Sequence, residues 1–362
     1  MTNDAITLLA AGDVIIAREQ PETIFRHVAD VLRSGDITLA DAEQVFSDKG
    51  TPRLHGMGKP APAGSNIIEA YKYAGINIVS LATNHFFAWG ETGAMDTIEN
   101  LKAAGIANFG AGKNLAEARK PAIVECKGTK IGFLNACTVH VPEDAATSDR
   151  PGVYGMRVWT FYQQVDSQAA TPPKIVSLSH REDLEALLAD IRSLRAQVDV
   201  VVLCMHWSVH LAPRMIGDYC IEIAHAAIDA GVDLVLGSHP HILKGIEVYK
   251  GKVIFYAMGN FALELGKGDH KDVAFFEALY KIGPQERHDS KKAVLAKVIL
   301  EDKQISRVSY LPVCANDDSE PLIYKKADPM GQEIFNYVED ISKSEHLVAN
   351  FEWDGDEVVI RP

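Results

Sequence analysis

Residues 198–241 read VDVVVLCMHWSVHLAPRMIGDYCIEIAHAAIDAGVDLVLGSHPH, and this stretch decides the fold class. The apolar runs 198–205 and 234–236 are typical of buried strands, and the amphipathic stretch 216–230 between them predicts a helix that stops at Gly231. A strand, a helix and a second strand in this order are typical of α/β folds with parallel strands. Each of the two strands is followed closely by histidine.

The same alternation extends over the first 260 residues. Strands are predicted at 6–11, 37–40, 78–81, 122–125, 131–136, 198–205, 234–236 and 253–257. Helices are predicted at 21–32, 65–74, 90–104, 181–196 and 216–230. Two hairpins, turning at Lys127-Gly128 and Lys250-Gly251, predict mixed sheets rather than purely parallel ones.

The chain is expected to form one main domain with two additions. Residues 1–312 carry the α/β pattern, and residues 313–362 are expected to be a C-terminal extension packed on the same domain. Its pattern includes a short helix near 330–342 and an acidic strand-like end. Residues 138–176 show no periodicity, and a loop of this length inside a domain is typical of a lid or a binding insertion.

Composition and charge exclude several classes of protein. The 36 Lys and Arg residues against 49 Asp and Glu give a net charge of −13, without the basic footprint that nucleic-acid binding requires. Five cysteines without CxxC spacing are expected to be reduced packing residues. No apolar run approaches the ~18 residues of a membrane span, and the N-terminus does not read as a signal peptide. A cytoplasmic location is therefore expected, with a small-molecule or oligomeric substrate.

Polar residues gather where the first three strands end. Asp13 follows the first strand, Asp41 and Glu43 end the second, and Asn84 and His85 follow the third. Taken singly, each has an ordinary alternative: a turn Asp, an exposed strand end, or a turn Asn beside a surface His. Ligands bind at the carboxyl ends of strands in open α/β sheets, so these positions are also candidates for a site.

Histidines end the two strands of the opening stretch. His206 closes an all-apolar strand, where a polar side chain is costly unless it has a partner, whereas His210 is equally explained as a loop residue. His239 and His241 form a His-x-His motif stiffened by Pro240, which is a strong local metal signal.

Together these positions predict a metal site. Five strand ends deliver oxygen or imidazole ligands and no cysteine, which suits one or two divalent ions, Mn, Zn or Fe, in a hydrolytic centre. The predicted metal ligands are Asp13, Glu43, Asn84, His206, His239 and His241.

The motifs also resemble a known family. Their order is GDV at 12–14, LADAE at 39–43, SLATNH at 80–85, HW at 206–207, GSHPH at 237–241 and IEVYKGKVIFYAMGNF at 246–261. This order resembles the bacterial capsule-synthesis, poly-γ-glutamate CapA family of the calcineurin-like metallophosphatase superfamily, over residues 5–265. The resemblance implies a four-layer α/β/β/α sandwich of two mixed sheets.

The resemblance also implies roles for individual residues. Asp13 and His241 would bind a first metal, and Glu43 would bridge or complete the pair. Asn84, His206 and His239 would hold a second metal. His85 would be the general acid that protonates the leaving group.

Three positions depart from the family pattern. Ile15 stands where the superfamily has a histidine, Asp41 where the family has Asn, and His210 where it has a carboxylate. Asp41 and His210 are therefore further candidates, either as metal ligands or as partners of the ligands.

The expected function is a metal-dependent hydrolase that uses metal-activated water on a phosphoester or related bond. One alternative is an amide or lactam hydrolase of γ-glutamyl type. Another is a non-catalytic polymer-biosynthesis or binding protein of the CapA type. Candidate substrate contacts in the 138–176 insertion are Arg150, Tyr154, Arg157 and Trp159.

Overall fold

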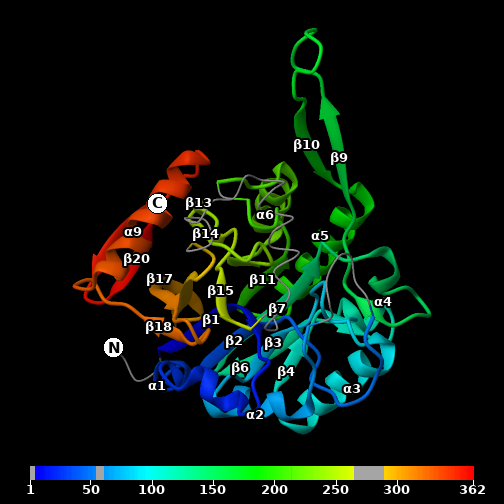
Figure 1. The fold of residues 1–362 in the computed structure, drawn as a ribbon, viewed down its shortest axis with the longest axis vertical. Coiled ribbons are helices and arrows are strands. Elements are labelled where there is room, and N and C mark those ends of the chain that lie inside the picture. Colours follow the sequence, from blue (N-terminus) through cyan, green and yellow to red (C-terminus); the bar gives the residue numbers. More distant parts are fainter. Residues whose placement is uncertain (1–4, 54–60, 213, 265–288) are drawn as a thin grey trace.

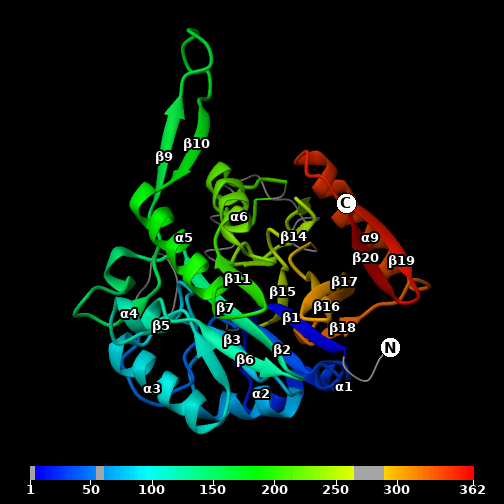
Figure 2. The same cartoon turned by 180° about the vertical axis from the view of Figure 1, so that it is seen from behind.

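Two mixed β-sheets form the centre of the molecule (Figures 1 and 2). The computed structural model describes residues 5–53, 61–212, 214–264 and 289–362. The larger sheet has ten strands, eight of them in the order β19 (Asn350–Asp354), β20 (Glu357–Arg361), β17 (Gln304–Ala315), β16 (Lys292–Glu301), β1 (Ile6–Ile15), β2 (Ile37–Ala42), β3 (Ile78–Ser80) and β4 (Ala107–Phe109). The other two are β15 (Asn260–Leu263), which pairs with β1, and β18 (Pro321–Ile323), which pairs with β17.

The second sheet has six strands. Their order is β13 (Ile246–Tyr249), β14 (Lys252–Phe255), β12 (Leu234–Ser238), β11 (Val200–His206), β7 (Thr129–Cys137) and β6 (Ala122–Cys126). β7, β11, β12 and β14 run parallel, whereas the predicted hairpins add β6 and β13 antiparallel at the two edges. Both hairpins turn through positive φ at Lys127-Gly128 and at Lys250-Gly251, the backbone of a tight two-residue β-turn.

Most of the predicted helices are present. The helices are η1 (Pro21–Phe25), α1 (Ala29–Arg33), η2 (Ser65–Ile67), α2 (Ile68–Ala74), α3 (Gly90–Ala103), α4 (Leu115–Ala118), η3 (Pro142–Asp144), α5 (Arg181–Arg195), α6 (Asp218–Ala230) and α9 (Pro329–Ser344). The single helix predicted over 21–32 is instead two short ones, η1 and α1. Between them the side chains of Arg26 and His27 turn to the carboxylate of Glu320.

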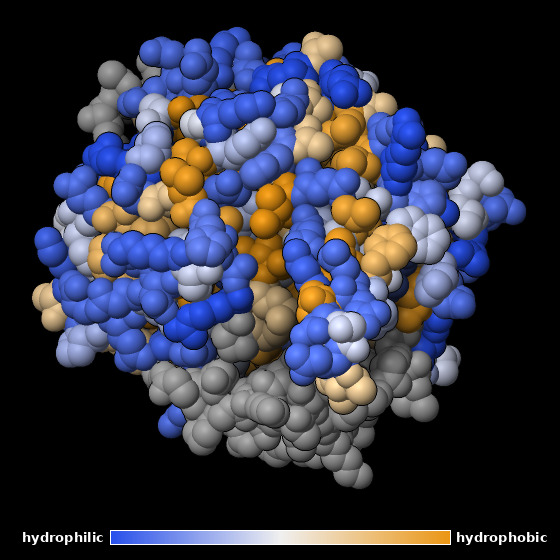
Figure 3. All heavy atoms as spheres, turned by 90° about the horizontal axis from the view of Figure 1, so that it is seen from above, coloured by the Kyte–Doolittle hydropathy of each residue, from blue (hydrophilic) through white to orange (hydrophobic). Residues whose placement is uncertain are grey.

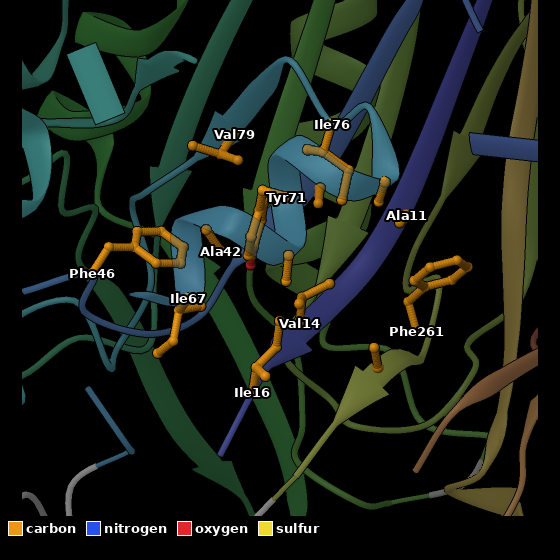
Figure 4. Close-up of a cluster of buried hydrophobic side chains, with 14 of the residues drawn as sticks. Ala11, Val14, Ile16, Ala42, Phe46, Ile67, Tyr71, Ile76, Val79 and Phe261 are labelled. Carbon is orange, nitrogen blue, oxygen red and sulfur yellow. The ribbon is translucent and has the colours of Figure 1, made fainter. Parts of the chain in front are cut away.

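Three apolar clusters define four layers. β1 shows the division, because Leu9 and Ala11 face one cluster while Leu8 and Ala10 face another. The first cluster packs α1, α2 and α3 on the outer face of the larger sheet, with Tyr71 of α2 lying over the strands (Figure 4). The second fills the space between the two sheets, and the third packs α5 and α6 on the smaller sheet. The expected α/β/β/α sandwich is therefore confirmed.

The parallel strands place their carboxyl ends together. β1, β2 and β3 are parallel neighbours in one sheet, and β11 and β12 are parallel neighbours in the other. The register of β1 shifts at Asp13, so this residue occupies an irregular position at the end of its strand. Asp13 lies two residues before the end of β1, and the other predicted ligands end or follow the remaining four strands.

Residues 138–176 are more regular than expected. They contain η3, β8 (Gly152–Val153), which pairs with β5 (Ala111–Gly112), and β9 (Val158–Gln163), which pairs with β10 (Lys174–Ser179). The β9–β10 hairpin projects from the body as a long arm (Figures 1 and 2). Its periodicity is invisible in the sequence because apolar side chains lie on both of its faces.

The C-terminal residues complete the larger sheet. β17 crosses position 312, and β18, β19 and β20 pair with it or with one another. Ile334, Val338 and Ile341 of α9 lie in the cluster between the sheets. The five cysteines are free, and four of them are buried. Within the described ranges no helix has the length and apolar character needed to cross a membrane.

Candidate metal centre

Glu43 lies at the centre of the candidate site, one residue beyond the end of β2. Its Oε1 is 3.4 Å from Nε2 of His206, 3.8 Å from Nε2 of His241 and 3.9 Å from Nε2 of His85. The residue is fully buried, and within the described ranges neither of its carboxylate oxygens receives a hydrogen bond. A buried carboxylate without hydrogen bonds is costly, so this position fits a bound cation.

Asp13 and His241, the two residues predicted to bind the first metal with Glu43, lie close to it. Oδ2 of Asp13 lies 3.7 Å from Nδ1 of His241, and the ligand atoms of Asp13, Glu43 and His241 all lie within 4.8 Å of one another. Both oxygens of Asp13 accept from the backbone N–H of His239, at 3.0 and 3.2 Å. This contact ties the end of β1 in one sheet to the end of β12 in the other.

His206 and His239 complete a second group around Glu43. The ligand atoms of Glu43, His206 and His239 also lie within 4.8 Å of one another. Nδ1 of His239 is buried and, in the described part of the chain, has no hydrogen-bond partner. Nε2 of His206 lies 2.7 Å from Oδ1 of Asn84, so the amide reaches the same group. Two ligand groups sharing Glu43 suit a pair of divalent ions.

Asp41 contacts a ligand on the side away from Glu43. Its Oδ2 lies 2.9 Å from Nδ1 of His206, and its Oδ1 accepts from the hydroxyl of Ser80 at 2.5 Å. A carboxylate on the far nitrogen fixes the tautomer and the ring orientation of a metal-binding histidine. The ligand atoms of Asp13, Asp41 and His206 also lie within 4.8 Å of one another, as a third group. The hydrogen bonds favour Asp41 as the orienting partner of His206.

The loop after β12 holds its two histidines in a strained backbone. His239 has φ of 93° and His241 has φ of 57°, a region that side chains other than glycine seldom occupy. Asn260 stabilises this conformation: its Oδ1 lies 2.8 Å from Nδ1 of His241, and its Nδ2 donates to the carbonyl of His241. β15 pairs with β1 so that Asn260 lies beside Asp13. Strain supported in this way is typical of functional sites.

His210 lies against the His-x-His motif. Its ring centroid is 5.4 Å from that of His239 and 4.9 Å from that of His241. Burial, with His241 close by, lowers the pKa of His210 to about 3. A neutral third imidazole is therefore present beside the two ligand groups, although it belongs to none of them.

The titration behaviour of the cluster suits metal binding. Burial alone would raise the pKa of Glu43, but the imidazoles of His241, His206 and His85 lower it to about 2, so this carboxylate is ionised. Burial and the neighbouring Glu43 and Asp41 raise the pKa of Asp13 well above its usual value. Burial, together with His206 and His210, lowers the pKa of His239 well below its usual value. Neutral imidazole is the form that binds a metal.

His85 occupies the outer side of the centre. Its side chain is 21% exposed, whereas those of Glu43 and His206 are fully buried. Its Nε2 is 3.9 Å from Glu43, farther than that of His206. The imidazole is therefore beside the ligand groups and in reach of solvent, as a proton donor must be.

The four candidate substrate contacts all have partners within the protein. The Arg157 guanidinium pairs with Asp183, and the Trp159 ring lies 5.5 Å from that of His180. Tyr154 is buried and its hydroxyl donates to Asp190, while Arg150 donates to the carbonyl of Ala145. Arg157 and Trp159 lie at the base of the arm. Arg150, Arg157 and Trp159 are exposed, whereas Tyr154 is buried.

Sequence reasoning missed the residues that orient the ligands. Ser80 and Ser238 are hydrogen-bonded to Asp41 and His206, and Asn135 accepts from the backbone N–H of Ala82, close to Asn84. A serine at a strand end carries no signal of its own. Only the register that places Ser80 beside Asp41 reveals it.

Comparison with known proteins agrees with this architecture. Residues 7–264 match the family described as bacterial capsule synthesis protein PGA_cap. The chain is 27% identical over 289 residues to the capsule biosynthesis protein CapA of Bacillus anthracis, covering 76% of this chain and 64% of that protein. It is 24% identical over 323 residues to the PGA biosynthesis protein CapA of Bacillus subtilis, covering 84% and 78%.

A third relative is a probable polyglutamine synthesis accessory protein of Mycobacterium tuberculosis, 34% identical over 204 residues, covering 54% of this chain and 47% of that protein. The chain thus spans less than two thirds of the length of the first and third of these relatives. The family match covers the strands and loops that carry every predicted metal ligand. The chain belongs to the bacterial capsule synthesis protein family PGA_cap.

Proposed function

We propose that this chain is a metal-dependent hydrolase that acts on a phosphoester or related bond. The observation that carries the proposal is Glu43, a buried carboxylate that receives no hydrogen bond from the described residues and lies between imidazoles from three different strand ends. Asp13, Glu43 and His241 would hold one ion, and Glu43, His206, His239 and Asn84 a second. Mn, Zn or Fe each suit such oxygen and imidazole ligands. Bound divalent metal would lower the pKa of water and neutralise charge that develops on the substrate.

The remaining residues have roles that follow from their contacts. Asp41 orients His206 through Nδ1, and Asn260 orients His241 in the same way. His85 holds a proton on the solvent side of the centre and gives it to the leaving group. A binding protein without catalysis has no need of a proton donor at this position, which favours the enzyme over the CapA-type accessory role.

Amide-bond hydrolysis, of the γ-glutamyl or lactam type, is the second candidate. Asp13, Asp41 and Glu43 place three carboxyl groups in the centre, which disfavours a dianionic phosphate close to it. The names of two relatives refer to PGA biosynthesis and to polyglutamine synthesis. One divalent ion held by these residues would supply the chemistry that this reaction needs, because it would lower the pKa of water and polarise a carbonyl.

We propose that the part of segment 138–176 that precedes β9, called its inner part, covers the metal centre. Thr138 donates its backbone N–H to the carbonyl of His206, so this part begins at the site. Of the four candidate substrate contacts, Arg150 and Tyr154 belong to this inner part. We also propose that residues 1–312 form one domain, that residues 313–362 are an extension packed on it, and that the protein is cytoplasmic.

The test separates metal binding from catalysis. Protein is stripped with chelator and reloaded with Mn²⁺ or Zn²⁺, and kcat/KM is measured on matched panels of aryl phosphoesters and of γ-glutamyl anilides. We expect turnover that depends on metal. His85→Gln should keep its metal while kcat falls by about 10²–10⁴-fold, most strongly for poor leaving groups. His346→Gln, a change at an exposed histidine, is the matched control.

Each outcome decides between the candidates. Turnover of phosphoesters alone supports the lead proposal, and turnover of anilides alone supports the amide candidate. A metal-loaded protein that turns over neither panel would favour the accessory role. If His85→Gln loses its metal, His85 is a ligand and the proton donor lies elsewhere.

A further inference from the structure

The arm formed by β9 and β10 exposes an unusual amount of apolar surface. Of the ten large hydrophobic side chains exposed in the described residues, six belong to this segment: Trp159, Phe161, Tyr162, Val165, Ile175 and Leu178. Tyr162 is 72% exposed and Trp159 is 54% exposed. An isolated two-stranded hairpin is marginally stable in water, so an arm of this composition is expected to pack against something.

The two faces of the arm differ in character. Cross-strand pairs share a face, so Trp159 and Leu178 lie on the same side as Phe161 and Val176. This face is an unbroken apolar stripe. Tyr162 and Ile175 lie on the other face, beside the polar pair of Thr160 and Ser177. Figure 3, seen from the side on which the arm projects, shows hydrophobic side chains at the surface among hydrophilic ones.

The outer edge of β10 already has hydrogen-bond partners within the protein. The N–H of His180 donates to the carbonyl of Arg157. The backbone N–H and C=O groups of odd-numbered residues in β9 therefore point towards β10, and those of odd-numbered residues in β10 point away from β9. Accordingly, the N–H groups of Ser177 and Ser179 donate to the carboxylates of Asp218 and Glu222 on α6. The body of the protein covers this edge at its base.

The edge of β9 is open. The same register points the N–H and C=O groups of Val158, Thr160 and Tyr162 away from β10, and within the described ranges β9 pairs with β10 only. Natural edge strands carry charge, proline or very short length to prevent unwanted pairing. The outer strands of the two large sheets follow this rule: β19 carries Glu352 and Asp354, β6 carries Glu125, and β4 has three residues. By contrast, residues 158–165 read VWTFYQQV, without charge, proline or glycine.

We propose that β9 pairs with β9 of a second copy of this chain. When β9 of one copy lies antiparallel to β9 of the other across a two-fold axis, the outward N–H and C=O groups of each strand can hydrogen-bond to those of its partner. Such a self-complementary contact is what a symmetric dimer requires. The product is a four-stranded sheet in the order β10, β9, β9, β10, with the stripe of Trp159, Phe161, Val176 and Leu178 continuous across it. A sheet of three or more strands with an apolar face is stable where a lone hairpin is not.

The charge of the arm favours a second copy as the partner. The chain carries a net charge of −13, but the arm between residues 158 and 178 contains only Asp166 and Lys174, so two arms meet without repulsion.

The test uses the full chain and two substitutions at one position. Thr160→Pro removes an outward N–H and leaves the β9–β10 ladder intact, because proline is tolerated where the N–H faces solvent. Thr160→Val keeps the N–H and is the matched control. By sedimentation equilibrium from 1 to 50 µM, we expect dimers of the wild type and of Thr160→Val. We expect a monomer, or a dimer Kd raised at least 100-fold, for Thr160→Pro.

A second variant distinguishes loss of strand pairing from a local folding defect caused by the proline. Tyr162→Lys places a charge at a position that is 72% exposed, so it leaves the fold unchanged and opposes pairing of the edge. Thermal unfolding and metal content of each variant should match the wild type. A wild-type chain that is monomeric at 50 µM overturns the proposal, as does a dimer that persists in both Thr160→Pro and Tyr162→Lys. The first result would leave a different protein or a surface as the partner of the arm.

Discussion

Around Glu43, residue-level contacts separate the metal ligands from the residues that hold them in place. Asp13, His206, His239 and His241 approach the carboxylate from the ends of three strands, β1, β11 and β12, and Asp41 and Asn260 contact the imidazoles from behind. His210 packs on two of the imidazoles and belongs to neither ligand group. Substitution of a ligand is therefore expected to remove metal, whereas substitution of an orienting residue is expected to weaken metal binding.

His239→Ala should remove metal more completely than His210→Ala. Nδ1 of His239 is buried and, among the described residues, accepts no hydrogen bond, so its expected role is to bind an ion. Metal content measured by elemental analysis after reloading and desalting should fall by about one equivalent for His239→Ala. His210→Ala should retain the wild-type content. Equal losses in the two variants would show that His210 is itself a ligand.

Asp41→Asn should weaken metal binding without abolishing it. The amide occupies the same volume, but it supplies a neutral partner for Nδ1 of His206 in place of a carboxylate. Loss of such an orienting group lowers metal affinity by about 10–100-fold. A competition titration against a chelating dye measures the affinity, with the exposed Asp30→Asn as the control. An unchanged affinity would exclude an orienting role for Asp41.

At the scale of elements, α9 joins residues near the C-terminus to the core between the sheets. Ile334, Val338 and Ile341 are fully buried in that core, beside residues of β1, β11 and β16. The extension therefore shares apolar contacts with the strands that carry the site. We expect it to unfold together with them.

Ile334→Ala should destabilise the whole chain. Removing a fully buried isoleucine costs about 2–5 kcal/mol through lost burial and the cavity left behind. Urea unfolding followed by tryptophan fluorescence should show one transition at lower denaturant. Glu339→Ala on the exposed side of α9 removes only an ion pair with Lys343 and should change stability by less than about 1 kcal/mol. A separate early transition for Ile334→Ala would instead indicate an independently unfolding extension.

At the scale of the whole molecule, Glu320 links the two ends of the described chain. Its carboxylate receives hydrogen bonds from Arg18 and Arg26 near the N-terminus and from Asn316, and it lies 3.1 Å from Nε2 of His27. Burial alone would raise the pKa of Glu320, but the hydrogen bonds from Arg18, Asn316 and Arg26 lower it to about 2. The folded state therefore binds the ionised form more tightly than the unfolded state does.

The stability of the protein should depend on this group in acid. Because the pKa of Glu320 is lowered by folding from 4.5 to about 2, its contribution is complete above about pH 4.5 and is lost as the pH falls towards 2. The contribution is about 2–3 kcal/mol. Urea unfolding at pH 7, 4 and 3 should show the wild type losing more stability than Glu320→Gln over this interval. Glu352→Gln, at an exposed side chain, should follow the wild type; parallel curves for wild type and Glu320→Gln would contradict the assignment.

The sequence alone was sufficient for most of the elements and for nominating the residues that the structure brings together around Glu43. Strands and helices that bury one face repeat apolar residues at a regular spacing along the chain. The five strands that carry the site, and the helices between them, were therefore predictable. Asp13, His206 and the His-x-His motif stand out because polar residues directly after apolar strands are costly unless they act together. The hairpin turns were predictable for the same local reason.

Only the tertiary structure decided which of these residues meet. Asp41 contacts His206 across 165 residues of chain, and Asn260 reaches His241 through the pairing of β15 with β1. The lack of hydrogen bonds to Glu43 from the described residues is likewise a property of the packed interior, not of the motif that contains it. The arm was missed because apolar residues occur on both of its faces, which obscures the period of two. Local patterns record what each segment buries, whereas contacts between distant strand ends depend on how the sheets pack.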